Sequence, residues 1–96
     1  MATGLRFEWD DAKRARNMEK HGVDFADAEN LEWGTALIAE DTRKDYGETR
    51  WIGFAMLAGR LHCIAFTRRK VVVRVISMRK AHWKEVRQYE HRKKSP

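Results

Sequence analysis

The chain has 96 residues, of which 43% are hydrophobic and 35% are charged. This length fits a single domain over residues 1–96 with one small core, and the hydrophobic share excludes a disordered chain. The single cysteine excludes an internal disulfide. Because no apolar run approaches the ~20 residues of a membrane span, we expect no membrane partner and a cytoplasmic location.

The charge is unevenly distributed along the chain. The net charge is +6, yet residues 1–48 hold 7 Lys/Arg against 12 Asp/Glu, whereas residues 49–96 hold 13 against 2. The first half is therefore acidic and the second half strongly basic. This asymmetry favours a polyanionic partner, such as a nucleic acid, for the basic half.

The first predicted elements are a short strand over residues 5–9 and a helix over about residues 11–21. Asp10 or Asp11 can cap the start of this helix, and Gly22 supplies the left-handed residue that ends many helices. The spacing of apolar residues predicts three inner positions: Ala12, Ala15 and Met18.

A second helix is predicted from about Phe25 to Trp33, with Asp24 as its cap and Gly34 at its end. Its expected buried stripe consists of Phe25, Ala28 and Leu31.

The rest of the chain has the pattern of a meander followed by a helix. Four strands are predicted, over residues 35–40, 48–57, 60–68 and 71–78. Ala58-Gly59 fits a tight turn, and a last helix over about residues 80–91 precedes a basic, frayed tail over residues 92–96. We therefore expect an α+β domain: a short first strand, two N-terminal helices, a four-stranded largely antiparallel sheet and a C-terminal helix.

The last predicted strand carries the most informative residues. Arg74 interrupts a run of valines, and Arg79 follows at the end of the strand. An arginine amid strand residues is costly to bury, so we expect Arg74 to face a cleft or a carboxylate. The guanidinium fork of arginines on a rigid sheet also suits phosphate. Strict alternation places Arg74 and Arg79 on opposite faces, so they converge only if the strand bulges or ends early.

Two separated blocks of sequence resemble the BrnT family. Residues 7–25 follow its opening, F-E-W-D-x-x-K-x-x-x-N-x-x-K-H-G-V-x-F, with no change of spacing. The second block comprises residues 45–50, 52–53, 59–61 and 74–81. Met78 stands where the family usually has alanine, and the resemblance covers about residues 6–90.

The resemblance implies a toxin of a type II toxin–antitoxin module, with a fold similar to that of the RelE-type ribonucleases and the ability to cut RNA. It also implies a small BrnA-like antitoxin with a DNA-binding segment, which neutralises the toxin and forms with it a complex that represses their operon. RNA, this antitoxin and operator DNA are therefore the expected partners.

Metal-free RNA cleavage needs proton transfer and cations that stabilise the phosphorane. The expected catalytic set is Arg79, Arg74, Glu48, His21 and Lys20, with Glu48 or His21 moving the proton. Further RNA contacts are expected from Arg50, Arg68, Ser77, Lys80 and Trp9. Because the sequence has no zinc-type spacing of Cys and His, we predict neither metal nor cofactor.

Several of these residues have a structural alternative. Glu48 and Arg50 can form a salt bridge, and His21 can interact with the end of its helix. Trp9 can anchor the core or an interface instead of stacking on a base. At the level of the whole chain, the alternative is a noncatalytic module that binds nucleic acid and antitoxin in operon autoregulation.

Overall fold

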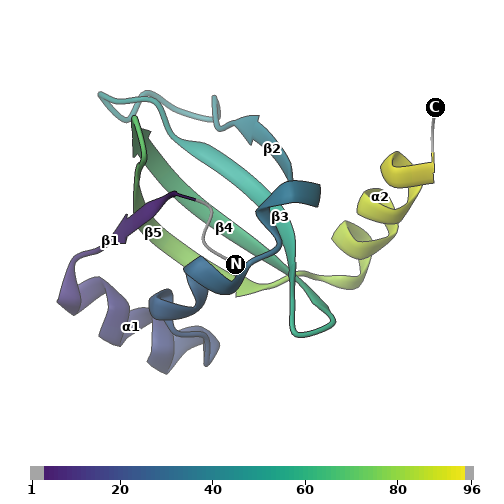
Figure 1. The fold of residues 1–96 in the computed structure, drawn as a ribbon, viewed down its shortest axis with the longest axis horizontal. Helices are drawn as coiled ribbons and strands as arrows, with labels where there is room; N and C mark the ends of the chain where they lie inside the picture. Colours follow the sequence, from purple (N-terminus) through teal and green to yellow (C-terminus); the bar gives the residue numbers. More distant parts are fainter. Residues whose placement is uncertain (1–3, 95–96) are drawn as a thin grey trace.

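The computed structural model describes residues 4–94, and it contains a five-stranded sheet with the strand order β1-β5-β4-β3-β2 (Figure 1). The strands are β1 (Arg6–Glu8), β2 (Leu37–Glu40), β3 (Trp51–Leu57), β4 (Arg60–Arg69) and β5 (Val72–Lys80). The helices are α1 (Asp11–His21) and α2 (Trp83–Lys94), with 3-10 turns η1 (Phe25–Asn30) and η2 (Trp33–Thr35) between α1 and β2.

The expectation of a four-stranded sheet is wrong, because the first strand joins the sheet. β1 pairs with β5 in parallel, with Arg6 opposite Val72 and Glu8 opposite Arg74, while the other neighbours are antiparallel. The sheet is therefore mixed. Local sequence patterns predict a strand but not its partner more than sixty residues away, which is why this pairing was missed.

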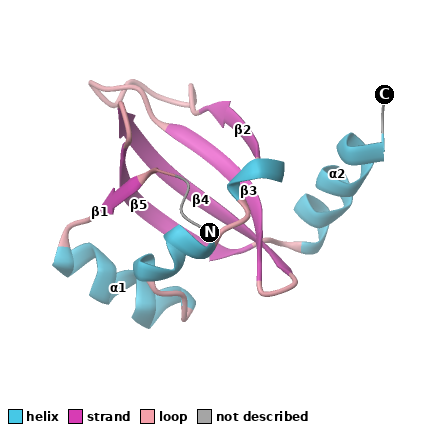
Figure 2. Ribbon diagram, viewed as in Figure 1, coloured by secondary structure: helices cyan, strands magenta, loops and turns pink. Residues whose placement is uncertain are grey.

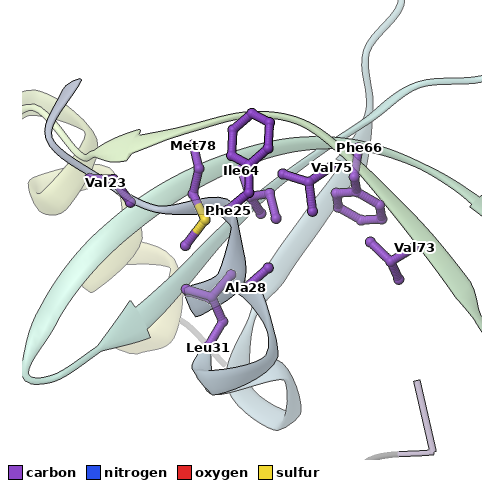
Figure 3. Close-up of a cluster of buried hydrophobic side chains, with 10 residues drawn as sticks. Val23, Phe25, Ala28, Leu31, Ile64, Phe66, Val73, Val75 and Met78 are labelled. Atoms are coloured by element: carbon purple, nitrogen blue, oxygen red, sulfur yellow. The ribbon is translucent and has the colours of Figure 1, made fainter. Parts of the chain in front are cut away.

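The core lies on one face of the sheet, under α1 and η1 (Figures 2 and 3). Its buried apolar side chains come from the segment after α1 and from β3, β4 and β5: Val23, Phe25, Ala28, Leu31, Ala55, Ile64, Phe66, Val73, Val75 and Met78. The predicted stripe of Phe25, Ala28 and Leu31 is confirmed, although η1 and η2 replace the expected second helix.

Helix α1 is rotated relative to its predicted orientation. Of the two candidate N-caps the structure has Asp10, and the C-cap Gly22 is confirmed. The three expected inner positions Ala12, Ala15 and Met18 are all exposed. The buried residue of the helix is Asn17. Its amide bridges to Val23 O at 3.0 Å, Met78 O at 2.8 Å and Met78 N at 3.2 Å. Polar bonding to β5, not an apolar stripe, thus sets the rotation of α1.

Helix α2 lies beyond β3, apart from α1 (Figure 1). None of its residues is buried, and Trp83 at its start is 64% exposed. It begins three residues later than predicted and continues through Lys94, so residues 92–94 of the expected frayed tail are helical and residues 95–96 lie outside the described residues. The predicted Ala58-Gly59 turn is confirmed, with both residues at positive φ.

Candidate functional site

A bulge in β5 brings the arginines of that strand to one face. Ala65 lies opposite Ser77 and Phe66 lies opposite Val75, so Ile76 is an extra residue without a partner in the register. The alternation of faces therefore shifts by one position after Val75. Val75 and Met78 both face the core.

The face opposite the core, here called the open face, is defined by six residues of β4 and β5. Cys63, Ala65 and Thr67 lie opposite Arg79, Ser77 and Arg74, respectively. The condition under which Arg74 and Arg79 share a face is therefore met. Two clefts, one at each of these arginines, open along this face.

The Arg79 cleft has a volume of about 450 Å³ and lies between β5, the end of β2, the following loop and α2. Its floor is the sheet, including Cys63, whose thiol pKa is raised by burial. Five charged residues line this cleft: Glu40, Asp41, Arg43, Arg79 and Glu85. The Ser77 hydroxyl adds a neutral hydrogen-bonding group beside Arg79.

Arg79 is held by Glu85 in a bidentate pair. Arg79 Nη1 donates to Glu85 Oε1 at 2.8 Å and Nη2 donates to Oε2 at 2.9 Å. Glu85 also accepts the backbone N–H of His82 at 2.8 Å. The hydrogen bonds from Arg79 lower the pKa of Glu85 to about 2 and raise the pKa of Arg79, so both groups are ionised at neutral pH.

A second guanidinium enters the same cleft from the loop after β2. Arg43 donates from Nε to Asp41 Oδ1 and from Nη2 to Oδ2, both at 2.8 Å, and the Tyr46 hydroxyl donates to Oδ2 at 3.0 Å. Asp41 is buried, and its pKa lies well below the ordinary value, mainly because of the hydrogen bonds from Arg43. Arg43 itself is 77% exposed. Its charge also acts on Arg79, opposing the effect of Glu85 on the pKa, as expected for two cations that face one cleft.

The Arg74 cleft, of about 610 Å³, lies further along the open face. Arg74 Nη1 donates to Glu8 Oε2 of β1 at 3.0 Å, and both side chains are about half exposed. Arg68, Arg69, Glu48 and two threonines also line this cleft.

The predicted site residues are therefore divided. Arg79 and Ser77 lie in one cleft and Arg74, Arg68 and Glu48 in the other.

Arg50 lines neither cleft. Its guanidinium stacks on the Tyr46 ring at 4.1 Å and lies 4.0 Å from Glu48, so the predicted salt bridge is present but long. The buried Nε of Arg50 has no hydrogen-bond partner among residues 4–94.

The other predicted residues lie away from both clefts. Lys20 and His21 end α1, and the pKa of His21 is lowered by burial and then by the charges of Lys20 and Arg79. Lys80 is exposed at the end of β5. Trp9 packs against the core, with the Arg14 guanidinium 5.5 Å from its ring centre, which supports its interpretation as a core anchor.

Four cleft residues were missed by sequence reasoning: Glu40, Asp41, Arg43 and Glu85. Glu85 had a detectable signal, because it lies three residues after His82, in the position from which a glutamate bonds back to the backbone at a helix start. The spacing of Asp41 and Arg43 permits a local ion pair, but nothing in it indicates that the pair borders a cleft.

Within residues 4–94, no helix has the length and apolarity needed to cross a membrane. The same residues contain no grouping of three or more His, Cys, Asp or Glu side chains suited to a metal ion.

Known proteins with a similar sequence and a similar fold belong to one family of toxins. Residues 9–85 match the family model described as the ribonuclease toxin BrnT of type II toxin–antitoxin systems. The crystal structure of the Brucella abortus ribonuclease toxin BrnT is 30% identical in sequence, with a TM-score of 0.64, and the match covers 81% of this chain and 97% of that chain. Comparison with curated proteins gives no match.

The chain is thus a small α+β ribonuclease toxin of a type II toxin–antitoxin system. It belongs to the BrnT family, as the two sequence blocks indicated.

Proposed function

We propose that this endoribonuclease cuts RNA in the Arg79 cleft without a metal ion. The observation that carries the proposal is the meeting of two guanidinium groups, from Arg79 and Arg43, in one cleft that also holds the Ser77 hydroxyl and has the exposed Glu40 at its rim. Each guanidinium is oriented by its own carboxylate, so neither must be ordered when the substrate arrives. Such preorganised cations stabilise the charge that develops on a reacting phosphate.

Arg79 keeps two donors for this role. A guanidinium has five N–H groups. Two donate to Glu85 and one, on Nη1, to Lys80 O at 3.3 Å. The remaining two, on Nε and Nη2, lie along one edge of the planar group. That edge matches two oxygens of a phosphate, so Arg79 can bind Glu85 and RNA together.

Glu40 is the group that we propose as the proton acceptor. It ends β2 at the rim of the cleft, is exposed, and has no ion-pair partner among residues 4–94, unlike Asp41 and Glu85. Its register partner Trp51 packs against the core, so the Glu40 side chain must turn around the end of the strand to reach the cleft. In the reaction the RNA 2′-oxygen bonds to phosphorus, its proton passes to Glu40, and the bond to the 5′-oxygen breaks. The leaving oxygen takes a proton from solvent, and a 2′,3′-cyclic phosphate remains. Glu48 and His21, the acceptors expected from the sequence, lie outside this cleft.

A protein antitoxin is implied by membership of a type II family. We propose that it is a BrnA-like protein that neutralises the toxin in the cytoplasm and that the complex binds operator DNA. The kinship with RelE-type ribonucleases likewise stays a prediction. The second candidate function is a noncatalytic module that binds nucleic acid and antitoxin. The basic character of residues 49–96 favours it as much as it favours RNA cleavage, because both functions need a surface that binds a polyanion.

The test uses the purified chain, freed of any antitoxin, with single-stranded RNA in excess chelator. We expect cleavage that leaves cyclic phosphate ends. Arg79→Ala should cut at least about 100-fold more slowly while keeping its circular dichroism spectrum. Arg16→Ala, which removes an exposed cation of α1 that lines neither cleft, is the matched control. Intact RNA with folded wild type, with and without Mg²⁺, would favour the noncatalytic module.

A further inference from the structure

The Arg74 cleft is separate from the Arg79 cleft but lies in line with it. The two clefts share no lining residue, yet both open on the same face of β4 and β5. Because Ile76 is bulged, Arg74 and Arg79 are four strand steps apart, which is ~13 Å between their backbones. Arg74 is also held toward Glu8 of β1 and not toward Arg79. The two arginines are thus placed to bind different groups.

The lining of the Arg74 cleft suits an anion. Three arginines and two carboxylates line it, which gives the cleft an excess of positive charge. Arg69 and Arg74 lie on the open face, whereas Arg68, opposite Val73, lies on the other face at the end of β4. Arg74 has one terminal nitrogen bonded to Glu8, and Arg68 donates from Nε to Lys70 O at 2.7 Å. The other N–H groups of Arg74 are available to a ligand on the open face. Thr67, directly opposite Arg74 in the register, adds a hydroxyl donor.

We propose that the Arg74 cleft is a second phosphate subsite, which binds the RNA backbone a few nucleotides from the bond cut in the Arg79 cleft. This inference rests on the proposed function and changes the role of Arg74 from catalysis to substrate binding. The alignment of the two clefts along β4 and β5 favours an extended single strand over a mononucleotide, because one strand presents phosphates to both clefts. Glu8 limits the affinity, since its carboxylate faces the same phosphate.

The first experiment measures binding of labelled, fully 2′-O-methylated oligonucleotides of about 4 and about 12 nucleotides, which cannot be cut. Wild type should bind the longer one at least about 10-fold more tightly. Arg74→Ala should lose this advantage, and its salt dependence should be shallower by about 0.7 for each lost phosphate contact. Glu8→Gln should bind the long oligonucleotide more tightly than wild type, and Arg16→Ala should match wild type.

The second experiment separates binding from chemistry with a cleavable RNA of the longer kind. Arg74→Ala should raise KM about 10-fold and leave kcat within about twofold, whereas Arg79→Ala should lower kcat. Arg69→Ala serves as a second variant if Arg74→Ala fails to fold, because it keeps the Glu8–Arg74 pair. Arg69→Ala should also raise KM.

Two outcomes would overturn the subsite: equal affinity of wild type for short and long oligonucleotides, or a loss of kcat in Arg74→Ala as large as in Arg79→Ala. Length-dependent binding that Arg74→Ala abolishes, in a protein that cuts no RNA, would support the subsite and reject the proposed function.

Discussion

Glu85 joins the start of α2 to β5 through its two hydrogen bonds with Arg79, of 2.8 and 2.9 Å. Because α2 buries none of its residues, few other contacts hold the helix in place. One is the hydrogen bond from the Tyr89 hydroxyl to Thr35 O at 3.2 Å. The orientation of the Arg79 guanidinium and the position of α2 therefore depend on each other.

Glu85→Ala should lower kcat by about 10-fold or more, because the unguided guanidinium no longer presents its free edge to the phosphate. Glu85→Gln, which keeps one acceptor oxygen, should retain more activity. If Glu85 acts only through Arg79, adding Glu85→Ala to Arg79→Ala should change kcat by less than about twofold. Steady-state kinetics of the four proteins in this cycle measure the coupling.

An additive result in that cycle, with each change costing the same in either background, would mean that Glu85 contacts the substrate itself. A rise in KM alone would place its effect on binding and not on the reacting phosphate.

The same pair predicts a pH dependence of stability. The pKa of Glu85 is lowered to about 2 from an ordinary 4.5, mainly by the hydrogen bonds from Arg79. A carboxyl group with a lowered pKa in the folded state stabilises the protein above pH 4.5, and this contribution is lost as the pH falls toward 2. The free energy of unfolding, measured with urea, should therefore fall more steeply between pH 4.5 and 2 for wild type than for Glu85→Gln.

Asp24 and Asp41 also have lowered pKa values, but both are present in the two proteins, so the difference isolates Glu85. Parallel curves of stability against pH would show that the pair is screened by solvent and contributes nothing measurable.

The sequence predicted those features of the fold that depend on neighbouring residues. Asp10, one of two candidate caps, bonds through its side chain to Lys13 N, and Gly22 and the Ala58-Gly59 turn act through their own backbone conformation; all of these contacts are local, and the sequence indicated them. The parallel pairing of β1 and the rotation of α1 depend on contacts across the fold. The amide of Asn17 meets Met78 sixty-one positions along the chain, which no helical periodicity reveals.

The candidate site was predicted only in part, because its residues come together through contacts across the fold. Arg74 and Arg79 stand out among apolar strand residues, so their role in a site could be expected. The bulge at Ile76 brings both to one face, and their separation into two clefts follows from their spacing along β5 and from partners on other elements, Glu8 and Glu85. Only the three-dimensional arrangement supplies these.

Glu40→Gln should lower kcat at least about 100-fold with little change in KM, because the amide cannot accept the 2′-hydroxyl proton but occupies the same volume. Glu48→Gln, in the other cleft, is the matched control and should keep kcat. Single-turnover cleavage of a short RNA measures the rate of the chemical step in both variants. Loss of kcat in Glu48→Gln alone would move the proton acceptor to the Arg74 cleft, as the sequence had suggested.

Asn17→Ala should destabilise the fold without touching either cleft. The change leaves Val23 O and both backbone groups of Met78 without their partner, which costs about 2–3 kcal/mol for buried groups. For a domain of this size the melting temperature should fall by roughly 10 °C or more. Met18→Ala is the control, because Met18 is 42% exposed and should cost less than about 0.5 kcal/mol. A larger loss in Met18→Ala than in Asn17→Ala would restore the sequence-based orientation of α1, in which Ala12, Ala15 and Met18 face the core.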